Sequence, residues 1–148
     1  MTTDWLRALE GPGYIWEQRS LPAGEAELAE LVAFFGRPLP QDYEAFLRFS
    51  NGGYLQYKDL WEIRFWRSGD IPRWSAAYGF VPARMPGAVA FADLPGGEGL
   101  VFDIRTDHAD QQYPILAVNF VTIGWEEALV VATDFRALVS LDRELLHR

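Results

Sequence analysis

The sequence predicts an α+β fold: one mostly antiparallel sheet flanked by helices, two of them N-terminal and one C-terminal. Two observations support this prediction. Helical periodicity is found near the beginning and at the end of the chain, whereas the residues between them read mainly as consecutive strands. This order is typical of α+β proteins, because α/β proteins alternate strand and helix. A length of 148 residues without internal repeats predicts a single domain over residues 1–148.

The N-terminal part is expected to hold a lead-in segment and then two helices. Residues 1–19 are rich in aromatic side chains but are broken by Gly11-Pro12-Gly13, which predicts a short helical or irregular lead-in. Apolar residues then recur at helical spacing until Gly36, which ends a helix easily because it adopts a left-handed conformation without steric penalty. Pro40 suits the first position of the second helix, which we expect to stop at Ser50-Asn51-Gly52-Gly53 with at least one glycine at positive φ.

The central part is expected to form the sheet. Trp61, Ile63 and Phe65 alternate with Glu62, Arg64 and Trp66, which is the period of a strand. Pro95 followed by Gly96 suits a type II turn and predicts a hairpin. Predicted strands lie at 88–92, 100–104, 113–120 and 128–132, and one short helix is compatible with 71–78.

The last element is expected to be a helix. Phe135, Leu138, Val139 and Leu145 fall on one side of a helical pattern. Thr133 is predicted to cap this helix, with Asp134 in its first turn.

Charge and composition limit the classes of partner. The net charge of −8 argues against nucleic acid, because binding phosphates requires an excess of Lys and Arg. The chain has no cysteine, no long apolar run and no signal-peptide pattern at its N-terminus, so we expect a cytoplasmic protein without a membrane partner. Eight acids but one base lie between Asp93 and Asp134, whereas bases outnumber acids between Lys58 and Arg84. The acidic stretch is either an ordinary solvated surface or a face that attracts a basic protein.

Motifs that carry chemistry are scarce, and we expect neither an enzyme nor a bound cofactor. The loop with Asp107, His108 and Asp110 is the nearest approach to a metal site, but it lacks the three or four rigidly held ligands that zinc takes and the spacing of a calcium loop. The glycines at 96–99 lack the Lys-Ser/Thr of a phosphate-binding loop and lie between strands. Glu126 and Glu127 are adjacent and would point to opposite faces of a strand.

Aromatic residues give a second candidate surface. In a strand of period two, Trp61 and Trp66 face opposite sides of the sheet. Trp66, Trp74 and Tyr78 are therefore expected either to form an exposed aromatic patch beside the local arginines or to be covered by further helices. Tyr, Trp and Arg dominate the hot spots of protein interfaces, which favours binding of a protein. A small-molecule pocket lined by Trp61, Trp66 and Trp74 is a less favoured alternative.

The segment Leu39-Pro40-Gln41-Asp42-Tyr43, continued to Asn51-Gly52-Gly53, resembles the opening motif of the SUKH superfamily. The glycine-rich turn and apolar strand at 96–103 and the segment 132–138 resemble later parts of the same family, so that the resemblance covers about residues 20–146. The resemblance implies a sheet flanked by helices and no catalytic residues. It also implies a protein partner, because bacterial members are typically immunity proteins that neutralise toxins and fungal members regulate cell-wall synthesis.

The functional prediction is therefore an immunity protein that binds a cognate toxin, the toxin being basic. The alternative is a regulatory or scaffold module of the same fold. The candidate partner-binding residues are acidic or aromatic: Glu98, Asp107, Asp110, Glu126, Trp66 and Tyr78.

Overall fold

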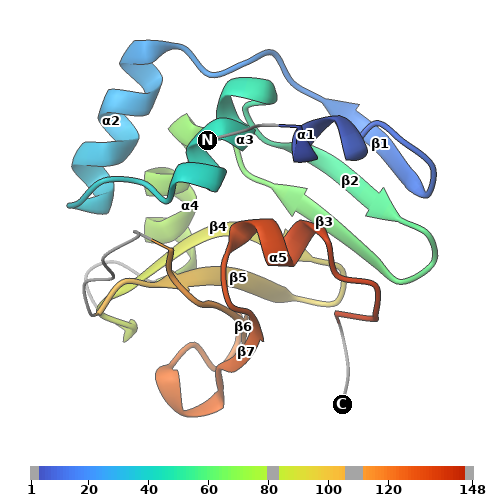
Figure 1. The fold of residues 1–148 in the computed structure, drawn as a ribbon. Helices are drawn as coiled ribbons and strands as arrows, with labels where there is room; N and C mark the ends of the chain where they lie inside the picture. The colour runs from blue at the N-terminus through green and yellow to red at the C-terminus, as the bar shows by residue number, and fades with distance from the viewer. Residues whose placement is uncertain (1–3, 80–83, 106–111, 146–148) are drawn as a thin grey trace.

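The computed structural model describes residues 4–79, 84–105 and 112–145, and it confirms the α+β prediction (Figure 1). Seven strands form one antiparallel sheet in which each strand pairs with the next along the chain. The strands are β1 (Tyr14–Arg19), β2 (Gly53–Tyr57), β3 (Trp61–Phe65), β4 (Ala88–Leu94), β5 (Glu98–Asp103), β6 (Ile115–Asn119) and β7 (Leu129–Ala132). The helices are α1 (Trp5–Ala8), α2 (Glu25–Phe35), α3 (Gln41–Phe49), α4 (Ile71–Tyr78) and α5 (Phe135–Val139), with short 3-10 turns η1 (Ser68–Asp70) and η3 (Trp125–Glu127).

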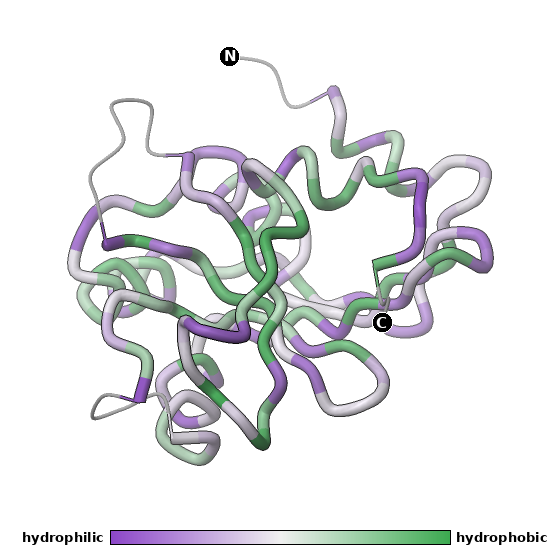
Figure 2. The backbone as a smooth tube through the Cα atoms, turned by 90° about the horizontal axis from the view of Figure 1, so that it is seen from below, coloured by the Kyte–Doolittle hydropathy of each residue, from purple (hydrophilic) through white to green (hydrophobic). Residues whose placement is uncertain are grey.

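The core lies between one face of the sheet, here called the inner face, and helices α3 and α5. Aromatic rings dominate it: the Tyr43 ring lies 5.1 Å from that of Phe102, and the Phe46 ring lies 4.7 Å from that of Phe65. Phe135 of α5 contacts the same cluster, 5.0 Å from Phe46. Hydrophobic residues accordingly follow the strands that cross the middle of the molecule (Figure 2).

Helix α4 covers part of the opposite, outer face of the sheet. Its Tyr78 ring stacks on that of Phe120, which follows β6, with the ring centroids 4.0 Å apart. The helix begins after η1 with Pro72 near its N-terminus and ends at Gly79, whose φ is 89°. The sequence left open that a further helix covers this face, and residues 71–78 were compatible with one.

The structure corrects four local predictions. Helix α5 ends at Val139, so Leu145 lies beyond it and not on its apolar side. The lead-in segment contains β1, an edge strand, after the short helix α1. Pro40 is the N-cap of α3 and lies just before its first residue. Asp134, rather than Thr133, caps α5, because its carboxylate accepts a hydrogen bond of 2.8 Å from the backbone N–H of Ala137.

The break after α3 contains the predicted glycines at positive φ, 87° for Gly52 and 130° for Gly53. A Cβ on Gly52 would lie 2.7 Å from the backbone oxygen of Phe65 and 2.9 Å from the backbone nitrogen of Arg67. Glycine is therefore required here for a close approach of two chain segments as well as for its backbone angle. The C-cap of α3 is Ser50, which is extended, so the two glycines follow the end of the helix and do not cap it.

The side chain of Asn51 connects segments that are far apart in the sequence. Its Oδ1 accepts a hydrogen bond of 2.9 Å from the backbone N–H of Ser68, and its Nδ2 donates to Glu27 of α2 at 3.4 Å. The side chain is buried, so these bonds satisfy polar atoms that water does not reach. The asparagine of the Asn-Gly-Gly motif thus holds α2 and η1 in place.

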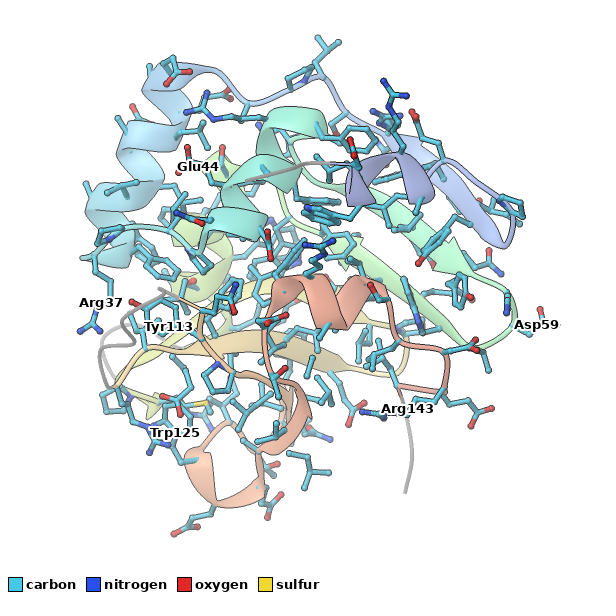
Figure 3. All side chains as sticks on the ribbon, viewed as in Figure 1. Arg37, Glu44, Asp59, Tyr113, Trp125 and Arg143 are labelled. Carbon is cyan, nitrogen blue, oxygen red and sulfur yellow. The ribbon has the colours of Figure 1, made fainter. Side chains whose placement is uncertain are left out.

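The C-terminal segment returns to the last strand. Arg143 donates from Nη2 to the backbone oxygen of Val131 in β7, at 2.9 Å (Figure 3). Nearer the start of the chain, the Tyr14 hydroxyl donates to the backbone oxygen of Val139 at 2.6 Å. The first strand and the last helix are therefore in direct contact.

Asp42 of α3 is a buried carboxyl group whose pKa is raised by loss of solvation, with the nearby Arg136 lowering it and Asp134 raising it further. A raised folded-state pKa means that the fold disfavours the carboxylate. Below the ordinary pKa of Asp, the group is protonated in both the folded and the unfolded protein, and the fold keeps its full stability. As the pH rises through the folded-state pKa, the group ionises in the fold and that part of the stability is lost.

We therefore expect Asp42→Asn to be more stable than the parent protein at pH 7, with a difference that shrinks as the pH falls toward about 4, near the ordinary Asp pKa. Urea unfolding at a series of pH values measures this difference. The exposed Asp59 in the β2–β3 turn supplies the control variant Asp59→Asn (Figure 3). A difference between Asp42→Asn and the parent that does not change with pH would contradict the assignment.

Candidate functional site

The predicted exposed aromatic patch is covered in part by α4. Trp66 is only 4% exposed, and its indole Nε1 donates to Asp93 Oδ2 at 2.7 Å. The Trp66 ring lies 5.9 Å from that of Trp74 and 6.1 Å from that of Tyr78, both of which are half-buried. Of the two alternatives that the sequence left open for Trp66, the structure supports cover by a helix, because Trp66 lies beyond the end of β3 and α4 packs on it. A contact of Tyr78 with a partner stays a prediction.

The acidic candidates are dispersed. Glu98 begins β5 and is half-buried, and Glu126 is exposed in η3. Asp107 and Asp110, with His108, lie outside the described residues. Other acids of the same stretch form hydrogen bonds within the fold. Asp93 accepts from Arg64 and Trp66, Asp103 accepts from Arg105, and Asp134 caps α5. Their charges are therefore not available to a partner to the extent that the sequence suggested.

The described part of the chain offers no cluster of three or more His, Cys, Asp or Glu side chains that could hold a metal ion. The loop predicted not to bind metal lies at 107–110, outside this part. The glycines at 96 and 97 form the turn between β4 and β5, both at positive φ. Trp61 and Trp66 line different hollows, so the alternative of one pocket lined by Trp61, Trp66 and Trp74 does not fit the structure.

The outer face of β1, β2 and β3, here called the open face, carries a row of polar side chains. Gln18 pairs with Tyr54, Tyr54 with Arg64, and Arg64 with Asp93, so that four neighbouring strands each contribute one residue. Residues directly opposite on antiparallel strands point to the same face. An irregularity in β1 between Trp16 and Gln18 makes this arrangement possible, because the extra residue shifts the alternation and places Gln18 outside while Trp16 stacks on Phe46 inside.

Hydrogen bonds fix three side chains of this row, those of Tyr54, Arg64 and Asp93. Arg64 donates from Nε and Nη2 to the Asp93 carboxylate, at 3.0 Å and 2.9 Å, and this bonding raises the pKa of Arg64. Tyr54 donates its hydroxyl proton to Glu62, which raises the pKa of Tyr54 to about 12. Asp93 therefore orients Arg64 and Trp66 together, and the row is ordered before any ligand arrives.

Next to this row, Trp74 of α4 lies near two guanidinium groups. The Cζ atoms of Arg64 and Arg73 lie 5.8 Å and 5.9 Å from its ring centroid. Such distances permit cation–π attraction, which stabilises the half-buried indole in its present position. A rigid aromatic ring beside fixed arginines is typical of the residues that contribute most to protein interfaces.

Three adjoining hollows cross the open face. The largest, of about 370 Å³, shares Gln18, Ser20 and Arg67 with the next, of about 200 Å³. The latter shares Arg64 with the third, of about 160 Å³, which reaches Asp93. We call this series of adjoining hollows the arginine groove. It can bind a polar, extended ligand, but its walls contain no arrangement that resembles a nucleophile with its base.

Sequence reasoning noticed the arginines near Trp66 but assigned none of them to the site. Gln18 was placed in a lead-in, and Asp93 was counted as part of an acidic surface. The alternation of Glu62 and Arg64 with buried residues was the available signal, since it places both side chains on the face that α3 and α5 do not cover.

Comparison with known proteins agrees with the fold. No described helix is both long and apolar enough to cross a membrane. No curated protein sequence matches the chain at a significant level. Residues 22–140 match the sequence model of the SMI1 / KNR4 family (SUKH-1), which includes every strand except β1. This match covers most of the chain, and the protein therefore belongs to the SMI1 / KNR4 family, SUKH-1.

Proposed function

We propose that the protein is an immunity protein that binds and neutralises a cognate toxin, and that it does so through the open face of its sheet. The observation that carries the proposal is the row of Tyr54, Arg64 and Asp93 beside Trp74 of α4, which is fixed by internal hydrogen bonds and lies on the face that α3 and α5 do not cover. Membership of the SUKH-1 family supports a role in protein binding rather than catalysis.

The charge of the protein supports a basic toxin as the partner. A net charge of −8 attracts a basic protein over a distance and raises its association rate. Exposed acids such as Glu126 contribute to this attraction without having to form the central contact. The overall charge and the arginine groove thus act at different stages, the first during encounter and the second in the final complex.

The experiment that tests the function is co-expression with a toxin encoded by a neighbouring gene. We expect the two proteins to co-purify and the growth of toxin-producing cells to be restored. A non-cognate toxin is the matched control and is expected to remain active. Toxicity that is unchanged in the presence of the folded protein, with no complex formed, would reject the immunity role and favour the regulatory module.

A further inference from the structure

The arginine groove contains a cation without an internal counterpart. Arg67 lines two of the three hollows and is exposed, and its guanidinium forms no ion pair or hydrogen bond with the residues that the structure describes. The neighbouring arginines differ in this respect: Arg19 pairs with Glu10 at 2.5 Å, Arg64 with Asp93 at 2.9 Å and Arg73 with Asp70 at 2.7 Å.

The acids that line the groove are already engaged. Asp70 and Asp93 accept from arginines, and Glu27 accepts from the backbone N–H of Gly24 at 2.8 Å. None of these bonds reaches Arg67, although Asp70 lies three residues along the chain. The groove therefore presents an unneutralised positive charge on a protein that is acidic overall.

The rest of the groove suits an extended backbone. Gln18 and Ser20 supply neutral polar groups along it, and Gly53 contributes no side chain to its floor. The half-buried Trp74 supplies an apolar surface at the edge of the same hollow. Because neighbouring hollows share residues, they adjoin one another along this side of the molecule, from the segment after β1 to the outer face of the sheet.

We propose that the arginine groove binds an extended segment of a partner protein that carries carboxylate side chains, and that Arg67 is the residue that receives a carboxylate. Alternate side chains of an extended segment point the same way, about 7 Å apart. Carboxylates at alternate positions therefore all face the groove while the intervening side chains face away. A guanidinium binds a carboxylate through two parallel charge-assisted hydrogen bonds, which gives both affinity and orientation. The inference rests on the proposed function only in taking the open face as the partner site.

The test uses a short capped peptide in which Glu and Val alternate, and the same peptide with Gln in place of Glu. Titration of the isotope-labelled protein followed by NMR is expected to shift the amide signals of Gln18, Gly53 and Arg67 and the indole signal of Trp74 with the Glu peptide. Arg67→Gln is expected to weaken this binding about tenfold, the equivalent of one charge-assisted contact. Arg7→Gln removes an exposed charge from α1, on the helical side of the molecule, and is expected to leave the affinity unchanged.

Three outcomes would overturn the proposal. Equal shifts with the Glu and Gln peptides would show that charge is not recognised, and shifts that lie outside the groove would show that the site is elsewhere. Equal or tighter binding of a single-stranded oligonucleotide would assign the groove to phosphate. The peptide test does not use the toxin, so a negative co-expression result does not affect it. Conversely, a negative peptide result would reject the groove as a carboxylate site without rejecting the immunity role, which the co-expression experiment tests.

Discussion

Gly52→Ala is expected to destabilise the protein by about 3 kcal/mol. A left-handed backbone costs a non-glycine residue roughly 1–2 kcal/mol, and overpacking adds roughly 1–3 kcal/mol. The overpacking arises because the new Cβ would lie 2.7 Å from the Phe65 oxygen and 2.9 Å from the Arg67 nitrogen, both of them backbone atoms that cannot rotate away. Urea unfolding monitored by tryptophan fluorescence measures the loss.

Gly36→Ala separates the two contributions. Gly36 has a φ of 83°, close to the 87° of Gly52, but a Cβ there would meet no atom within 4 Å. We expect this variant to lose only the backbone term, roughly 1–2 kcal/mol. If both variants were destabilised equally, the close approach of the β2 entry to the end of β3 would not be the reason for glycine at position 52.

Trp74→Ala is expected to weaken binding to the cognate toxin by about 2 kcal/mol, or roughly thirtyfold in Kd. The indole lies near the guanidinium groups of Arg64 and Arg73 and lines the arginine groove, so its removal takes away the apolar part of the proposed interface. Calorimetry or surface plasmon resonance gives the affinity, and circular dichroism checks that the variant is folded.

Trp125→Ala is the matched control, because this indole is also half-buried but donates to the Pro86 backbone oxygen in another part of the molecule. It is expected to leave the Kd unchanged.

Glu98→Lys and Glu126→Lys test the acidic surface and are expected to slow association and reduce its dependence on salt. The opposite outcome would place the interface on the acidic surface: the two charge reversals would strongly accelerate dissociation, and Trp74→Ala would leave it unchanged.

Local patterns in the sequence were sufficient for the elements that depend on local interactions. The helix at 25–35 ends at Gly36 as predicted, with φ of 83°, and Trp61, Ile63 and Phe65 are buried on alternate positions of β3. The hairpin around Pro95 also forms where the turn residues indicated. In these places the period of the apolar residues and the conformational freedom of glycine decide the structure.

The open face could not be predicted, because it depends on how distant segments align. The extra residue in β1 decides that Gln18 faces outward, and the pairing register brings it into line with Tyr54 and Arg64. For a related reason, the sequence left open whether Trp66 is exposed or covered. Alternation along a strand gives the side of the sheet, but not whether a helix elsewhere in the chain covers that side.

The strictly sequential order of the strands has a consequence for biosynthesis. Each strand from β2 to β7 pairs with the strand that precedes it in the chain, so its partner has already been made when it leaves the ribosome. Sheets assembled from neighbouring strands close shorter loops than sheets whose strands cross over, and shorter loops lower the entropic barrier to folding. The bond from Tyr14 to Val139 is of the opposite kind, because it joins residues 125 positions apart. The nascent chain can therefore extend its sheet during translation, whereas the helical layer over β1 is completed only when α5 has emerged.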